Sequence, residues 1–142
     1  MFRLEYGGRI VEKWPVKADD YSANYVWDKG NILTKDSDGN AQIAPVNSTG
    51  PFGIALERRQ APIGDDTTPD ETYLAGVVSV ITGESVGLTD DLTSGVTFAV
   101  NDKLYTDGGK FTNGAGTGSV VARVREVKAD GSLEIFFRPA DI

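Results

Sequence analysis

The sequence predicts an all-β protein made of short strands, and three observations lead to this class. The 142 residues include 17 glycines and scattered Val, Thr and Ile, with no long stretch that follows the 3.6-residue period of an amphipathic helix. Asp-Gly pairs recur between short apolar runs, which is typical of hairpin turns. A pattern of hairpin, glycine-containing loop and apolar strand occurs twice. At this length the chain is expected to form one domain with a hydrophobic core.

Residues 1–24 are expected to form an extended N-terminal arm ahead of a β domain at residues 25–142. Apolar and charged residues alternate from Phe2 to Tyr6, and residues 9–14 have the composition of a second short strand before Pro15. The large apolar side chains of this segment allow two interpretations. They pack on the domain, or they act as anchors on a partner protein.

Residues 30–57 have the pattern of a hairpin followed by a buried strand. The apolar pair Ile32-Leu33 begins the hairpin, Asp38-Gly39 is the predicted turn, and residues 52–56 form the later strand. Residues 36–40 also resemble the start of a calcium-binding loop. The twelfth position is Asn47 instead of Glu, and strands instead of helices flank the loop, so a turn is expected here.

The middle of the chain combines a long loop with the most apolar strand. Residues 57–72 are rich in Pro, Asp and Thr and predict an exposed loop. Residues 73–83 follow as a β-branched, nearly continuous apolar strand in the centre of a sheet. A short strand is expected up to Leu88. Residues 89–95 are expected to form one helical turn, capped by Thr89 or Asp90 and ended by Gly95.

Residues 101–124 repeat the pattern of residues 30–56. Leu104 takes the place of Leu33, and Asp107-Gly108-Gly109 takes the place of residues 36–39. The repeat places Ala122 where Ala55 stands in the first copy. A final hairpin turns at Asp130-Gly131. Two copies of one unit predict a pseudo-symmetric small barrel or a folded-over sheet, which also protects the edges of the short strands.

The composition excludes several kinds of chemistry. Cys and His are both absent, so disulfides, thiolate catalysis and a Ser-His-Asp triad are excluded. The net charge of −7 argues against a phosphate-binding nucleic-acid surface. No apolar run reaches the roughly 20 residues of a membrane span. The charged N-terminus is expected not to be a secretion signal.

Acidic residues in loops and a glycine-rich segment are the two sequence features that a catalytic or phosphate-binding role could use. Acidic residues gather in predicted loops, and a hydrolase with paired carboxylates remains an alternative to a solvated face. These residues are Asp65, Asp66, Asp70, Glu71, Asp90 and Asp91. The glycines of residues 114–118 lack the Lys-Ser/Thr of a phosphate loop and are expected to form a β-loop. We therefore expect no enzyme activity, no cofactor and no metal.

The order of motifs along the chain resembles the head decoration proteins of tailed bacteriophages, the group that includes the lambda head decoration protein. Five segments carry the resemblance: KGNIL at residues 29–33, DSDG at 36–39, PFGIALE at 51–57, AGVVSV at 75–80 and NDKLYTDGGK at 101–110. Each motif is generic for β proteins, and the order and spacing give the resemblance its weight. It covers about residues 27–139, and the loop at 57–72 is longer than the family pattern.

The resemblance implies a small β-tulip domain on the outer surface of the virion. Such proteins are commonly trimers that bind the major capsid protein and cement neighbouring subunits of the mature head, without nucleic acid or membrane. An N-terminal arm often adds a strand to a capsid element. The implied capsid contacts are in the arm and the loop: Phe2, Arg3, Leu4, Tyr6, Arg9, Trp14, Arg58 and Arg59.

A carbohydrate-binding or other surface-binding β module without catalytic activity is the alternative function. Aromatic side chains would act as stacking platforms for sugar rings in such a module. The candidates are Trp14, Trp27, Tyr73 and Tyr105.

Overall fold

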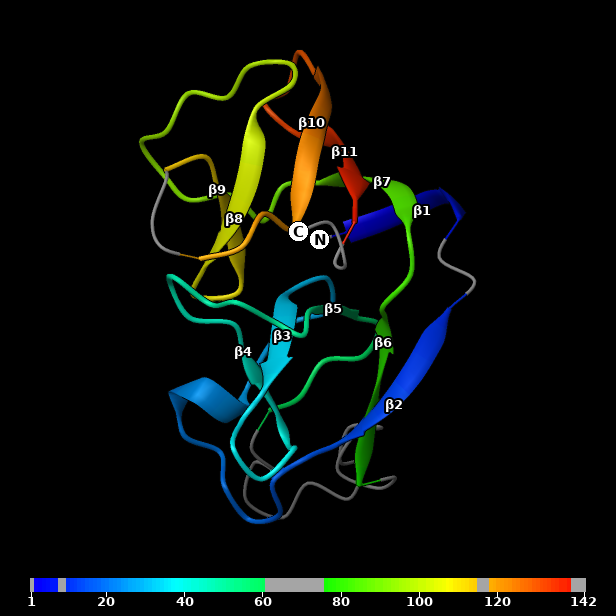
Figure 1. Ribbon diagram of the computed structural model, residues 1–142, viewed down its shortest axis with the longest axis vertical. Coiled ribbons are helices and arrows are strands. Elements are labelled where there is room, and N and C mark those ends of the chain that lie inside the picture. Colours follow the sequence, from blue (N-terminus) through cyan, green and yellow to red (C-terminus); the bar gives the residue numbers. More distant parts are fainter. Residues whose placement is uncertain (1, 8–9, 61–75, 115–117, 139–142) are drawn as a thin grey trace.

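The computed structural model describes residues 2–7, 10–60, 76–114 and 118–138, and the side chain of Tyr6 lies outside this description. The described strands form two antiparallel sheets, which lie one above the other in Figure 1. The lower sheet contains, in spatial order, β2 (Val11–Pro15), β6 (Val77–Ile81), β5 (Gly53–Ala55), β3 (Ile32–Lys35) and β4 (Ala41–Ile43). The upper sheet contains β1 (Phe2–Gly7), β7 (Ser85–Thr89), β11 (Leu133–Phe137), β10 (Ala122–Val127), β8 (Lys103–Asp107) and β9 (Lys110–Thr112).

The two sheets repeat one five-strand unit. The first unit has the order β2-β6-β5-β3-β4, and the second has the order β7-β11-β10-β8-β9, so each strand has a counterpart five strands later in the chain. β1 is an additional strand beside β7. The predicted repetition is therefore present, and it extends to five strands where the sequence predicted three.

Each unit curls until its two edges meet. In the first unit Val16, just after β2, forms a parallel bridge to Ala41 of β4. In the second unit Leu92, beyond β7, forms the equivalent parallel bridge to Phe111 of β9. These bridges join the first and last strands of each unit, which removes most of the open sheet edge. The predicted all-β, barrel-like class is confirmed.

The turns that precede β3 and β8 are also equivalent. The Asp28 N–H donates to Asn31 Oδ1 at 2.9 Å, and the Ala99 N–H donates to Asp102 Oδ2 at 2.9 Å. Inside these turns Gly30 and Asn101 have φ angles of 96° and 73°. Both residue types tolerate this left-handed region, which explains how different sequences form the same turn.

The register of the sheets corrects one detail of the predicted repeat. Leu33 lies opposite Gly53 and Leu104 lies opposite Ala122, so Ala122 corresponds to Gly53 and not to Ala55. The prediction matched the two alanines by residue type. The structure instead requires a glycine in the first copy, because a Cβ at position 53 would lie 2.8 Å from the Val80 Cβ.

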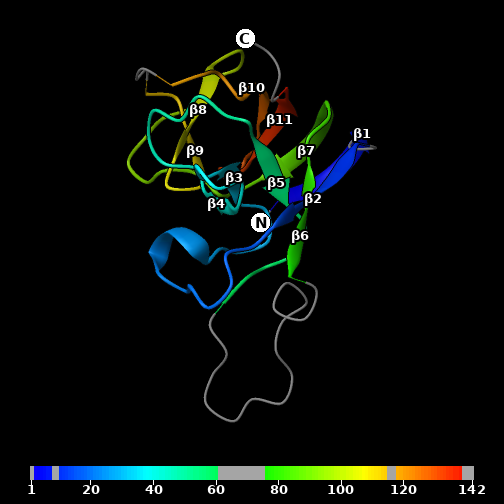
Figure 2. The same ribbon diagram turned by 60° about the horizontal axis from the view of Figure 1, so that its bottom comes forward.

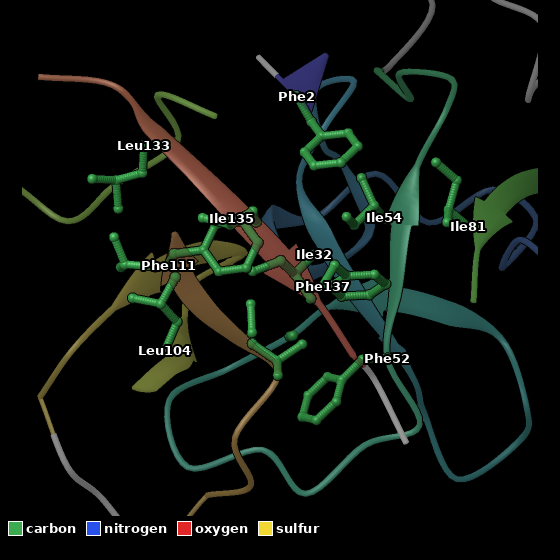
Figure 3. Packing of buried hydrophobic residues seen from close by; sticks show 14 residues of the cluster. Phe2, Ile32, Phe52, Ile54, Ile81, Leu104, Phe111, Leu133, Ile135 and Phe137 are labelled. Atoms are coloured by element: carbon green, nitrogen blue, oxygen red, sulfur yellow. The ribbon is translucent and has the colours of Figure 1, made fainter. Parts of the chain in front are cut away.

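A hydrophobic core joins the two units. One face of the first unit contributes Ile32, Ile54 and Ile81, which pack with Leu133, Ile135 and Phe137 of the second unit. Figure 3 shows these side chains converging from both units, with Phe52 and Phe2 at the margins. A smaller cluster fills the inside of the first unit and includes Trp14, Trp27, Leu33 and Val80.

The expected N-terminal arm is wrong for the described residues, because both of its strands belong to the sheets. β1 pairs with β7 in one sheet, and β2 pairs with β6 in the other. Phe2 is 8% exposed and Trp14 is 2% exposed. Gly87 leaves room for the Phe2 ring, since a Cβ there would lie 2.4 Å from it. The packing interpretation of the large apolar residues therefore holds for Phe2 and Trp14.

The hairpin turns are confirmed, whereas the helical turn at residues 89–95 is wrong. Gly39, Gly109 and Gly131 lie in the predicted turns and have φ angles of 85°, 81° and 89°. Thr89 is instead the last residue of β7, and its Oγ1 accepts a hydrogen bond from the Asp91 N–H at 3.2 Å. The only helical element among the described residues is the 3₁₀ turn η1 (Ala23–Tyr25). The described residues therefore contain no helix that is long and apolar enough to cross a membrane.

Candidate interaction surface

β1 forms one edge of the six-stranded sheet. It pairs with β7 on one side, and no described strand lies on its other side. Figure 2 shows β1 at the margin of the sheet beside β7. Arg3, Leu4 and Glu5 are exposed along this strand, and Leu4 is 41% exposed. An edge strand offers backbone N–H and C=O groups that another chain can pair with.

Two further aliphatic side chains are exposed at the first residue of β2 and at the residue before it. Ile10 is 62% exposed although its carbonyl oxygen accepts a hydrogen bond from the Thr82 N–H at 3.0 Å. Val11, the first residue of β2, is 47% exposed. Leu4, Ile10 and Val11 are thus exposed aliphatic side chains in or beside the two N-terminal strands.

Arg59 occupies a buried position at the other end of the first unit. It is 1% exposed, and its guanidinium donates to the carbonyl oxygens of Lys17, Asp20 and Tyr25. The Cζ atom of the Arg59 guanidinium also lies 4.3 Å from the centre of the Tyr21 ring. These contacts fix the connection between β2 and β3. Arg59 is therefore a structural residue, and its expected role as a surface contact is wrong.

A shallow groove lies beside this connection. It has a volume of about 500 Å³ and is lined by residues of both units, among them Asn24, Trp27, Asn31 and Gly108. Trp27 is only 5% exposed, and its indole N–H donates to the Glu57 carbonyl oxygen at 3.0 Å. Its ring is therefore not available as a flat platform.

The remaining predicted site residues divide into exposed and undescribed groups. Arg3, Leu4 and Arg58 are exposed, as a contact role requires. Phe2 and Trp14 are core residues, so their expected roles as contacts, and that of Trp14 as a sugar platform, are wrong. Arg9, Tyr73, the Tyr6 side chain and residues 61–72 of the predicted loop lie outside the described residues. Tyr105 is half-buried in β8.

The Asp36 carboxylate, which had a calcium-loop spacing, serves the hairpin turn. It accepts hydrogen bonds from the Asp38 and Asn40 N–H groups at 2.9 and 2.8 Å, and from the Tyr25 hydroxyl at 2.8 Å. Burial by itself raises the pKa of this carboxyl, but these hydrogen bonds outweigh it and hold the pKa below its usual value. In the described part of the chain, no group of three or more Asp or Glu residues could hold a metal ion.

The comparisons with known proteins leave the chain without an assigned family. No protein-family model and no curated protein sequence matches it.

Proposed function

We propose that this chain is a structural protein of a tailed-phage head, which attaches to the outer surface of the shell and holds neighbouring major capsid protein subunits together. The proposal rests on the resemblance of residues 27–139 to head decoration proteins and on the two barrel-like units that those motifs build. In this function the chain performs no catalysis.

The observation that carries the proposal is that no strand of the described residues pairs with the outer edge of β1. The sequence predicted a loose arm that would add a strand to a capsid element. The structure offers a fixed edge strand in its place, with Arg3, Leu4 and Glu5 exposed. A fixed edge binds with a smaller loss of conformational entropy than a flexible arm does. We infer that a strand of the capsid protein pairs with β1, and that the bound molecules form trimers around the shell's threefold positions.

The experiment compares heads with and without the protein. Purified heads that carry the wild-type chain are heated, and DNA release is followed with a dye that reports exposed DNA. We expect release at a lower temperature from heads that lack the protein. Equal release temperatures would overturn the cementing function.

A pair of variants tests the β1 edge separately. Leu4→Asp places a carboxylate on the edge strand, and Val46→Asp makes the same change at an aliphatic side chain that is 57% exposed elsewhere. We expect Leu4→Asp to weaken binding to heads by about tenfold or more, because a charge would be desolvated in the contact. Val46→Asp is expected to bind as the wild type does. Equal binding of both variants would exclude the β1 edge as the contact.

A further inference from the structure

The second unit carries a row of four side chains, three of which are exposed or half-buried although their counterparts in the first unit are buried. In the first unit the row consists of Val11, Ile81, Ile54 and Ile32, which lie opposite one another across adjacent strands. In the second unit the same positions hold Val86, Phe136, Arg123 and Lys103. Residues opposite each other in antiparallel strands project from the same face.

The two rows have different surroundings. Ile32, Ile54 and Ile81 are covered by the core that joins the units. Val86 is 4% exposed, Phe136 is half-buried, and Arg123 and Lys103 are exposed. Val86, Phe136 and Arg123 line a hollow of about 510 Å³ together with Arg125. The positions that dock the first unit onto the second are therefore open on the second unit at Phe136, Arg123 and Lys103.

The charges on this row are unusual for the chain. Arg123 lies directly opposite Lys103, and like charges at opposite positions destabilise a sheet. Neither side chain has an ion pair or hydrogen bond in the described part of the chain. The chain as a whole carries a net charge of −7, so this row is a local positive site on an acidic protein.

Nearby carboxylates define which anion fits. Arg125 Nε lies 3.7 Å from Glu134 Oε1, and Arg138 Nε lies 3.3 Å from Glu84 Oε1. Each of these carboxylates already pairs with an arginine, so the positive charge of the row without a partner in the described part of the chain is that of Arg123 and Lys103. Two charges match one or two carboxylates better than a continuous polyanion such as a nucleic acid. A short segment with one or two carboxylates and an apolar side chain can pair with Arg123 and Lys103 and also pack on Phe136.

We propose that this row binds a short, extended acidic segment of a partner protein. One carboxylate of the segment pairs with Arg123 and Lys103, and a neighbouring apolar side chain packs on Phe136 and Val86. The row crosses four strands spaced about 4.8 Å apart, which matches about five residues of extended chain. Val86 lies opposite Tyr6 of β1, so this site is on the sheet face beside the β1 edge, and its existence does not depend on the capsid function.

The test uses a fluorescent peptide of alternating Asp and Leu and measures its anisotropy with the purified full chain. Binding is expected, and it should weaken as the salt is raised from about 0.05 to about 0.5 M. A peptide of alternating Lys and Leu should not bind. Absence of binding by the acidic peptide, or equal binding of both peptides, would overturn the proposal.

Charge-changing variants locate the site. Arg123→Glu and Lys103→Glu should each weaken peptide binding by about tenfold or more, whereas the control Lys110→Glu, at an exposed lysine of β9, should change it by about twofold or less. Lys103→Glu should also raise the melting temperature, because it replaces a like-charge pair with an opposite-charge pair. Arg123→Gln removes one charge of the like-charge pair and should lose binding with a smaller rise of the melting temperature than Lys103→Glu gives. Equal losses in the control would mean that only the overall charge matters, which contradicts the proposal.

Two further measurements distinguish other occupants. A single-stranded oligonucleotide that binds more tightly than the acidic peptide would overturn the proposal in favour of a phosphate-binding surface. Sedimentation that shows dimers dissociated by Arg123→Glu would overturn it in favour of a second copy of this chain. A monomer that prefers the peptide is the result that supports it.

Discussion

The guanidinium of Arg59 donates a hydrogen bond of 2.7 Å to the carbonyl oxygen of Asp20, 39 residues earlier in the chain. The same side chain donates to the carbonyl of Lys17 at 2.7 Å and to that of Tyr25. One buried cation thus satisfies three backbone acceptors of the connection between β2 and β3. This connection has little regular structure besides η1, so its conformation depends on Arg59.

Replacing Arg59 is expected to destabilise the protein strongly. Arg59→Met should lower the free energy of unfolding by about 3–5 kcal/mol, because three partly buried carbonyl groups lose a charged donor. Arg58→Met is the matched control at the exposed neighbouring position and should change it by about 0.5 kcal/mol or less. Urea denaturation measures both values. Similar midpoints for the two variants would show that the Arg59 contacts do not stabilise the fold.

The Tyr25–Asp36 contact predicts a dependence of stability on pH. The folded-state pKa of Asp36 is below the unfolded value of about 3.9, so its contribution is present above that pH and is lost as the pH falls through the lower folded pKa. Tyr25→Phe removes the 2.8 Å hydrogen bond and should cost about 1 kcal/mol at neutral pH. The difference from wild type should shrink below about pH 4. A difference that stays constant down to about pH 2 would exclude this linkage.

Two turn glycines should differ in their tolerance of Val. Gly39 has a positive φ but nothing within 4 Å of an added Cβ, so Gly39→Val should cost about 1–2 kcal/mol from backbone strain. At Gly109 the Cβ would also lie 3.0 Å from the Ile43 Cδ1, so Gly109→Val should cost about 3 kcal/mol or more. Thermal melting of the two variants, with Gly39→Asn as a tolerated control, checks the order. The reverse order would contradict the turn assignments.

The N-terminal strands are expected to be necessary for folding. Trp14→Ala should lower the free energy of unfolding by about 3–5 kcal/mol, because Trp14 fills the inside of the first unit. Val11→Ala, at an exposed position of the same strand, should have a small effect. Deletion of residues 1–20 removes β1 and β2 and should abolish the cooperative melting transition. A deletion variant that melts like the wild type would restore the interpretation of a separable arm.

The hairpins could be predicted from sequence because their turn chemistry is local. Asp38-Gly39 and Asp130-Gly131 determine their own backbone angles, so short-range patterns suffice. The positions of β1 and β2 could not be predicted in the same way. β1 pairs with β7, and the paired residues lie between 78 (Gly7 and Ser85) and 87 (Phe2 and Thr89) positions apart. Nothing in the local alternation of Phe2 to Tyr6 specifies this partner.

The burial of Arg59 also escaped the sequence interpretation. Two adjacent arginines suggest a surface charge, since buried arginine is rare. The sequence gives a partial signal for this burial: in an extended segment Arg58 and Arg59 project to opposite sides, so only one of them can face solvent fully. The three carbonyl acceptors, however, come from residues that only the closed first unit brings together. The pairing of Lys103 with Arg123 likewise could not be predicted from the sequence, because it depends on the register of β8 and β10.

The most direct test of the central claim is a density map of mature heads that carry this chain, at a resolution that shows individual strands. We expect the chain on the outer surface, with a capsid-protein strand hydrogen-bonded along the free edge of β1. Heads without density for the chain, or density in which β1 faces solvent, would contradict the proposed function.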